Sequence, residues 1–367
     1  MLRGGARRLP LVPWLQLSRR MKIVCATDFT PRAQSAARVA VELARRIGGS
    51  VELVRVYSPR PADVQVLTAE LGLLEHEVRD SVEAHLRALA RELNEPGGVP
   101  VTAYFAEGPV EDSLLDRARA VGADLIVMGA HGSPALQRLI LGSTAERLVG
   151  CADRPVLIVP PGVDGLGAAE EEDSAGERRA LRIMAALDGR RAGQASVAFV
   201  RRLGSRTACD VTFLRLYRPA EEYRRLGLTP SADRAAADLA VIDDLERALR
   251  AQVTNLLGPG VTVLAVRPTG GDPAMRLLAI AREQPCDLIV MGAESRHGWG
   301  RITHPPVARS VARHALDVAV VFVPAIAAAP AAEPASRRVT RRARRRLPPA
   351  PIERTGISDH AERKEPR

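Results

Sequence analysis

The chain has 367 residues, 46% hydrophobic and only 3% aromatic, which suits two domains of about 150 residues with cores of Val, Leu, Ile and Ala. No stretch approaches the roughly 20 apolar residues of a membrane helix, and the four cysteines form no C-x-x-C pair that would indicate a disulfide scaffold or a metal site. The net charge is +10, but residues 1–20 contribute +5 and residues 325–367 contribute +6, which leaves −1 for residues 21–324.

The cysteines lie within or beside apolar runs, which predicts buried free thiols in a reducing, cytoplasmic compartment. They are Cys25, Cys151, Cys209 and Cys286. The arginine-rich residues 1–20 have an apolar part broken by Pro10 and Pro13, and no small-residue cleavage site follows, which argues against a secretory signal. Because a clean strand begins at Met21, we expect residues 1–20 to be a disordered leader or a start assigned too early.

Segment 21–161 alternates short apolar runs with helical patterns. Apolar runs of this length indicate strands buried on both faces, as in a parallel sheet, and they lie at 21–28, 51–57, 123–130 and 155–160. Thr30 supplies an N-cap and Pro31 a first helical residue for a helix that Gly48 and Gly49 end. Apolar residues at helical spacing from 78 to 93 predict a longer second helix.

The same order of elements returns in segment 181–324. MKIVCATD at 21–28 returns as LRIMAALD 160 positions later, and VELVRVY at 51–57 returns as VTFLRLY at the same offset. ADLIVMGA at 123–130 returns as CDLIVMGA with an offset of 163. Duplication is the economical explanation, and right-handed crossovers then make each half a three-layer α/β/α sandwich.

Two segments have compositions that cannot build a core. Residues 162–180 are rich in Gly and acidic residues, which predicts a linker. Residues 325–367 are rich in Ala and Pro and then in Arg, with seven Arg between 337 and 346, which predicts a disordered basic tail. The simpler interpretation is a solvated tail; contact with nucleic acid through these arginines is the alternative, and no membrane partner is expected.

Segment 128–148, MGAHGSPALQRLILGSTAERL, carries the spacing G-x2-G-x9-G-S. Gly129 and Gly132 would let the backbone approach a ligand without a Cβ clash. Ser143-Thr144-Ala145-Glu146 is typical of a capping box, so a helix is expected to open here, and a helix N-terminus offers N–H donors to phosphate. Ligands of open α/β sheets bind beyond the carboxyl ends of strands, where this loop and Asp28 both lie.

Asp28 in CATDFT, this glycine pattern and PVLIVP together resemble the universal stress protein family, closely over 21–160 and in outline over 181–324. The resemblance implies in each half a five-stranded parallel sheet of order 3-2-1-4-5, Rossmann-like and similar to adenine-nucleotide alpha hydrolases. It also implies that the intact first half binds ATP, with or without Mg²⁺. The residues carried over are Asp28 at the adenosine end, Val56 at the adenine pocket, Thr27 and Met128 as wall residues, Gly129 and Gly132 beside the ribose and phosphates, and Gly142, Ser143 and Thr144 as phosphate donors.

These residues also have plainer interpretations. Asp28 could serve only as a turn residue before the helix, and Ser143 could do nothing beyond capping. The glycines could serve the turns of their own loop. His131 is in place for a catalytic base, but a solvated loop residue is the preferred interpretation.

The second half departs from the pattern. Aligned without gaps, it keeps Gly292 opposite Gly129 and Asp188 opposite Asp28, but it has Ser295, Pro305 and Pro306 opposite Gly132, Gly142 and Ser143. Because proline has no N–H, two prospective phosphate donors and a hydroxyl are lost together. Arg296 and Arg301 could restore some anion affinity, but without the backbone geometry. We therefore expect the second half to be structural or regulatory.

Catalytic motifs are absent from the sequence. It has no G-x4-G-K-[ST] loop, no dinucleotide fingerprint after the first strand and no nucleophile elbow at Ser143, so no catalytic residue and no metal ligand is assigned. We expect a cytoplasmic ATP-binding module whose loaded state alters contacts with a protein partner. The resemblance allows at most slow ATP hydrolysis or self-phosphorylation.

The alternative is a scaffold that acts through its interfaces and binds no nucleotide. In either case the apolar strands at 155–160 and 318–324 would be hazardous if left bare at a sheet edge. We expect them to pair across the halves as an internal pseudo-dimer, with further homo-oligomerisation left open.

Overall fold

A computed structural model of the chain describes residues 20–58, 75–94, 98–130, 141–166, 179–187, 191–227, 234–257, 262–266, 272–293 and 306–325. Several sequence predictions lie outside these described residues: those on residues 1–19, the middle of the linker at 167–178, the tail from 326, and on His131, Gly132, Asp188, Ser295, Arg296, Arg301 and Pro305. Within the described residues no helix is long and apolar enough to cross a bilayer.

The first half alternates strands and helices. Its elements are β1 (Lys22–Ala26), α1 (Pro31–Ile47), β2 (Ser50–Tyr57), α3 (Glu75–Leu93), β3 (Val101–Glu107), α4 (Val110–Ala120), β4 (Leu125–Gly129), α5 (Ser143–Cys151) and β5 (Val156–Val159). All pairings among these strands are parallel, in the order β3-β2-β1-β4-β5. This confirms the predicted strand order 3-2-1-4-5.

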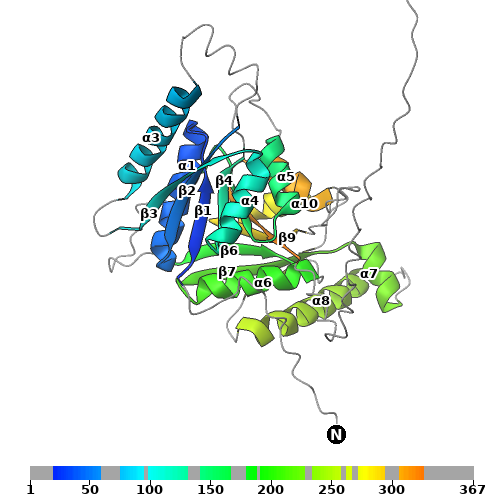
Figure 1. Cartoon of the computed structure of the whole chain (residues 1–367). Coiled ribbons are helices and arrows are strands. Elements are labelled where there is room, and N and C mark those ends of the chain that lie inside the picture. Colours follow the sequence, from blue (N-terminus) through cyan, green and yellow to red (C-terminus); the bar gives the residue numbers. More distant parts are fainter. Residues whose placement is uncertain are drawn as a thin grey trace, which may run out of the picture. The chain divides into compact units, whose positions relative to one another are not determined.

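The second half repeats the arrangement (Figure 1). Its elements are β6 (Leu181–Ala186), α6 (Arg191–Gly204), β7 (Cys209–Leu216), α7 (Pro219–Leu226), α8 (Arg234–Leu257), β8 (Thr262–Val266), α9 (Pro273–Glu283), β9 (Leu288–Ala293), α10 (Pro306–His314) and β10 (Ala319–Pro324). Its strands are parallel in the order β8-β7-β6-β9-β10, again 3-2-1-4-5. The short helix α7 has no counterpart among the sequence predictions.

Local signals explain where α1 begins and ends. The Thr30 side chain accepts a hydrogen bond from the N–H of Ala33, and Pro31 stands in the first turn. Gly48 closes the helix at φ 61, in the left-handed region that glycine adopts without a Cβ penalty. The predicted N-cap and C-cap are both confirmed.

Each half has three layers. One hydrophobic cluster joins the sheet to α1, α3, α6 and α8, and the other joins its opposite face to α4, α5, α9 and α10. Neighbouring residues of β1 show why: Ile23 and Cys25 belong to the first cluster and Val24 to the second. Successive side chains of a strand point to opposite faces, so a strand covered on both sides is apolar throughout.

The fifth strands of the two halves pair with each other, as predicted. β10 runs antiparallel to β5, with Leu157 opposite Val321, so a sheet of ten strands forms among the described residues. Leu157 and Val321 also occupy equivalent positions in the two halves. Ile126 and Ile289 hold the same place in the repeated fourth strand, and they lie opposite Val156 and Val320, the residues just before Leu157 and Val321. The halves are therefore related by a pseudo-twofold axis between Leu157 and Val321.

The segment after β5, predicted to belong to a linker, packs against the sandwich where it is described. Val163 and Leu166 are buried in the cluster beside α1, and the Leu166 N–H donates to Glu42. A Cβ added at Gly162 would lie 2.8 Å from the carbonyl oxygen of Leu316, so only glycine fits between the halves here.

The cysteines are free but not uniformly buried. Cys25 is fully buried, and burial raises the pKa of its thiol to about 12. The prediction of a buried thiol is wrong for Cys151, which is exposed because it is the last residue of α5. Burial also raises the pKa of Cys286 to about 12 and of Cys209 to about 11. No described cysteine therefore has a stabilised thiolate.

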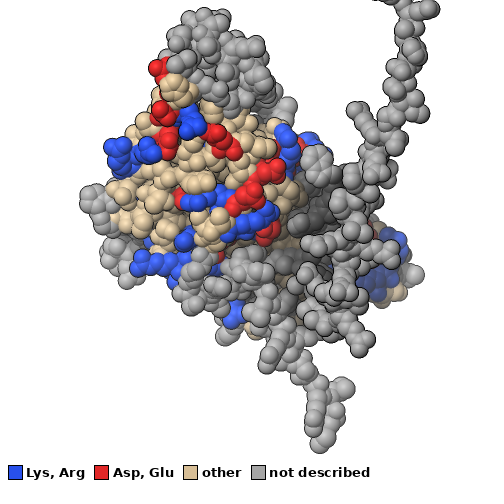
Figure 2. Space-filling view, viewed as in Figure 1, with Lys and Arg blue, Asp and Glu red and all other residues tan. Residues whose placement is uncertain are grey.

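Acidic and basic side chains are interspersed on the visible described surface, with no large field of one sign (Figure 2). This fits the charge of −1 that remains for residues 21–324 once both terminal segments are set aside. The arginine-rich tail itself lies outside the described residues.

Candidate functional site

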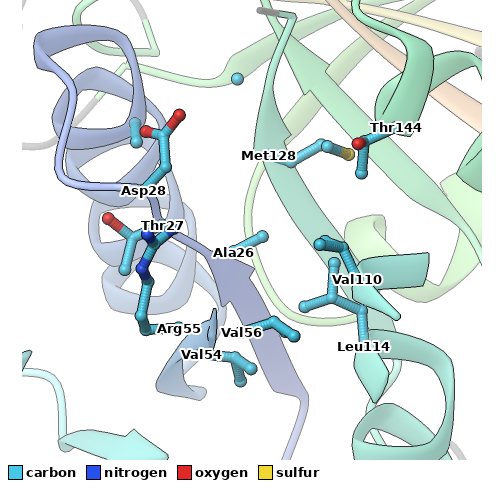
Figure 3. Close-up of a pocket in the computed structure, with 12 residues that line it drawn as sticks. Ala26, Thr27, Asp28, Val54, Arg55, Val56, Val110, Leu114, Met128 and Thr144 are labelled. Atoms are coloured by element: carbon cyan, nitrogen blue, oxygen red, sulfur yellow. The ribbon is translucent and has the colours of Figure 1, made fainter. Parts of the chain in front are cut away.

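A cavity of about 240 Å³ opens at the carboxyl ends of β1, β2 and β4 in the first half (Figure 3). Its walls come from the β1–α1 connection, the end of β2, the start of α4, the end of β4 and the first turn of α5. The lining residues are Ala26, Thr27, Asp28, Ala33, Val54, Arg55, Val56, Val110, Leu114, Met128, Gly129 and Thr144.

The β1–α1 connection is held by its own side chains. The buried Thr27 continues the sheet, since its N–H donates to the Val54 carbonyl, and its hydroxyl oxygen accepts from the N–H of Phe29. Asp28 Oδ1 accepts from both the N–H and the hydroxyl of Thr30, at 3.1 Å and 2.6 Å. Asp28 Oδ2 accepts no hydrogen bond from a described residue. The carboxylate thus shapes the turn with one oxygen and leaves the other available.

Phe29 is the only non-glycine residue at positive φ among the described residues, with φ 68. Its ring meets the His85 ring edge to face, with 4.4 Å between centroids, and the Arg55 guanidinium lies 5.4 Å from the ring centroid. A left-handed backbone is unfavourable for an aromatic residue, so these contacts hold a strained turn in place beside the cavity.

Arg55 was not predicted from the sequence. It sits on β2 between the two valines that face the cavity, and its Nε is buried with no hydrogen-bond partner among the described residues. Burial lowers the pKa of its guanidinium, and the negative charge of Asp28 offsets part of that shift. The Arg55 guanidinium thus lies beside the Asp28 turn, over the Phe29 ring.

The remaining wall is apolar. Val54, Val56, Met128 and Leu114 are all buried there, and Val110 joins them from the first residue of α4. Figure 3 shows Val110 and Leu114 on the α4 side, across from Val54 and Val56. The two α4 residues were not predicted, because no motif marks them and only the packing of α4 brings them to the site.

Gly129 ends β4 next to the first turn of α1. A Cβ built on it would lie 3.4 Å from the carbonyl oxygen of Arg32 and 3.7 Å from the nitrogen of Ala33. This is van der Waals contact, so a larger side chain would press on the helix that follows Asp28. The next predicted glycine, Gly132, lies outside the described residues.

The helix α5 begins one residue earlier than a Ser143 cap would require. Gly142 is the N-cap, without a side-chain cap, and its N–H donates to the Ala130 carbonyl at 2.8 Å. The predicted capping box is therefore wrong: Ser143 is the first helical residue, and the Glu146 carboxylate pairs with Arg309 and, at 3.6 Å, with Arg313. Because Gly142 already uses its N–H and the first helical hydrogen bond is that of Glu146, Ser143, Thr144 and Ala145 are the amides that this turn can offer an anion.

Six of the nine predicted site residues line the cavity: Thr27, Asp28, Val56, Met128, Gly129 and Thr144. Gly142 and Ser143 lie outside its lining, although they precede Thr144 directly at the start of α5. The described residues contain no group of three or more His, Cys, Asp or Glu side chains that could hold a metal ion.

The second half differs at the equivalent helix. α10 begins at Pro306 as α5 begins at Ser143, and both helices have nine residues. The proline therefore stands where the first half has a free N–H and a hydroxyl.

The Universal stress protein family model matches residues 19–160 and 180–324. A universal stress protein of Mycolicibacterium smegmatis is 25% identical over 311 residues, covering 82% of this chain and 97% of that protein. Universal stress protein MJ0531 of Methanocaldococcus jannaschii is 30% identical over 138 residues, covering 38% of this chain and 81% of that protein. A solved universal stress protein from Archaeoglobus fulgidus matches with TM-score 0.52 at 16% identity, covering 83% of this chain and 98% of its own. That last likeness shows the fold, and the two matched regions coincide with the two halves of the sheet.

Proposed function

The chain belongs to the universal stress protein family, and from that premise we propose that its first half binds an adenine nucleotide, ATP above all, as a switch for contacts with a protein partner. The observation that carries the proposal is one cavity where three separate segments meet: the Asp28 turn, the end of β4 and the first turn of α5. These are the segments that the sequence pattern singles out.

The cavity suits the nucleoside end. Its volume of about 240 Å³ lies below the roughly 300 Å³ at which sites for whole drug-sized ligands begin, so a base and ribose would fill it and phosphates would extend beyond it. The apolar walls fit the faces of a purine. Asp28 Oδ2 can accept from a ribose hydroxyl or an exocyclic amine.

The start of α5 suits the phosphates. The Ser143 and Thr144 amides belong to the first turn, where helical N–H groups have no partner within the helix. The partial positive charge of the helix N-terminus adds to their attraction for an anion. Mg²⁺, if it binds, would be held mainly by the phosphates themselves.

A bound nucleotide would connect the Asp28 turn and the start of α5, which both border the cavity. A nucleotide held by Asp28 at one end and by α5 at the other would fix the distance between the α1 and α5 connections. The nucleotide-bound protein would therefore present a different surface from the nucleotide-free protein, and we propose that a cytoplasmic protein partner binds only one of these two forms. The second half, with Pro306 at its equivalent helix start, would contribute no matching site.

Titration calorimetry of the full chain with ATP, ADP, AMP, cAMP and adenosine tests the proposal. Ser143→Pro copies the residue of the second half, keeps a helix start that proline favours and removes one free amide. A charge-assisted hydrogen bond contributes about 1.5–3 kcal/mol, so ATP affinity should fall about tenfold or more while adenosine affinity hardly changes. Asp28→Ala should weaken both ligands.

The matched control is Asp116→Ala, which removes an exposed carboxylate on α4 whose side chain is 75% exposed. It should leave all affinities unchanged. If the parent protein binds none of these ligands after bound nucleotide has been extracted and assayed, the proposal is wrong. The scaffold function then remains, and partner capture becomes the next experiment.

A further inference from the structure

The two halves meet through residues that are equivalent in sequence but opposite in charge. Glu146 is the fourth residue of α5 and Arg309 the fourth residue of α10, and their side chains form an ion pair, with Arg313 3.6 Å from the same carboxylate. Residues near a twofold axis meet their own equivalents. Here the equivalents have diverged into a glutamate and an arginine.

A second, buried position shows the same divergence. Asp124 and Asp287 are equivalents, because each precedes the fourth strand of its half and accepts from the N–H of an equivalent residue, Lys22 or Arg182, at 2.8 Å. Asp124 also forms a 2.8 Å ion pair with Arg202 of α6, and both side chains are fully buried. At an offset of 160, the first-half residue equivalent to Arg202 is Glu42.

We propose that these charges select the partner of the fifth-strand face: the first half accepts a second half and rejects another first half. Two first halves joined by the same operation would bring Glu146 against Glu146 and Asp124 against Glu42. Two second halves would bring Arg309 against Arg309. Buried or closely opposed like charges are costly, and only the pairing between unlike halves gives opposite charges both where Glu146 meets Arg309 and where Asp124 meets Arg202.

The pseudo-twofold places the Glu42 carboxylate on the side of the Asp287 carboxylate, and an arginine pairs with each of them. Arg179, from the end of the linker, makes a bidentate pair with Asp287 at 2.7 Å and 2.9 Å. Arg46 pairs with Glu42 at 3.0 Å and also donates to the Arg179 carbonyl. Each carboxylate thus has its own arginine, and one of the two comes from the segment that exists because the halves are fused.

The test exchanges the charges in the full chain. Glu146→Arg and Arg309→Glu each introduce the residue that the other half has at the equivalent position, so each creates a like-charge contact between the halves. We expect each to raise the equilibrium constant for unfolding by about two- to fivefold, the effect of a partly exposed ion pair. The double exchange restores opposite charges and should recover most of the loss in urea midpoint. Additive effects of the two changes would overturn the inference.

The matched control is the neighbouring pair Arg147–Glu111, 3.0 Å apart and within the first half. Joint refolding separates selection from simple stability. Arg309→Glu chains refolded together with tagged Glu146→Arg chains have complementary halves on different molecules, so affinity capture should recover mixed two-chain particles. The control exchange, Arg147→Glu chains with Glu111→Arg chains, should give no more capture than two parent chains. Capture of the Glu146 and Arg309 variants at the control level would contradict the proposal, even where one variant alone fails to fold.

Discussion

The Asp28 carboxylate uses its two oxygens differently, and this decides between two interpretations of the residue. Its Oδ1 accepts from the N–H and hydroxyl of Thr30, as a turn residue would, while Oδ2 faces no described donor. The turn role and the proposed ligand role are therefore compatible. The sequence motif located Asp28, but it could not locate Arg55, whose place depends on the register of β2 beside β1.

Phe29 supports a prediction at the same scale. Its φ of 68 penalises any residue with a Cβ by about 1 kcal/mol relative to glycine. Phe29→Ala and Phe29→Gly lose the same ring contacts, so Phe29→Gly should be the more stable variant by about 1 kcal/mol in urea unfolding. In an unstrained turn the order would be reversed, and finding that reversed order would show that the turn is not strained.

At the scale of elements, the hydrophobic periodicity and the residues that begin and end helices predicted the strands and helices well. The Thr30 and Gly48 caps of α1 and the long helix α3 match their sequence signals. The capping box predicted at Ser143 does not form, because the Glu146 carboxylate pairs with arginines of α10 and does not turn back toward the start of its own helix. Sequence signals within one turn cannot anticipate a partner more than 160 residues away.

The contact between α9 and α10 gives a pH prediction. The Ser310 hydroxyl and then the Ala274 N–H donate to Asp272 and hold the pKa of this carboxyl below its usual value. A lowered pKa in the folded state means that the charged form favours folding. This stability is present above about pH 4, the unfolded value, and is lost as the pH falls through the folded pKa.

Asp272→Asn keeps an N-cap but cannot titrate. The difference in urea midpoint between the parent protein and this variant should therefore be constant from neutral pH to about pH 4 and change below it, with the parent losing more. A difference that stays constant down to the lowest pH would mean that Asp272 is not a preferentially charged cap.

At the scale of the whole molecule, a fully buried ion pair between Asp124 and Arg202 joins the two halves. Asp124→Asn keeps an acceptor for the Lys22 N–H but leaves the Arg202 charge uncompensated at a position with no solvent access. Removing one partner of a buried pair costs about 3–5 kcal/mol, whereas the exposed Asp116→Asn should change stability by less than about 0.5 kcal/mol. Guanidinium unfolding of both variants checks this, and equal small effects would place the Arg202 charge in contact with water.

The pairing of β5 with β10 has a consequence for the cell. Two separate chains that associate through such strands are subject to mass action and come apart when they are scarce. A covalent connection replaces that equilibrium with a fixed effective concentration, in the millimolar range for short flexible connections. The assembled sheet is then equally complete in a cell with few copies and in a cell with many. Expression level would set only the number of working particles.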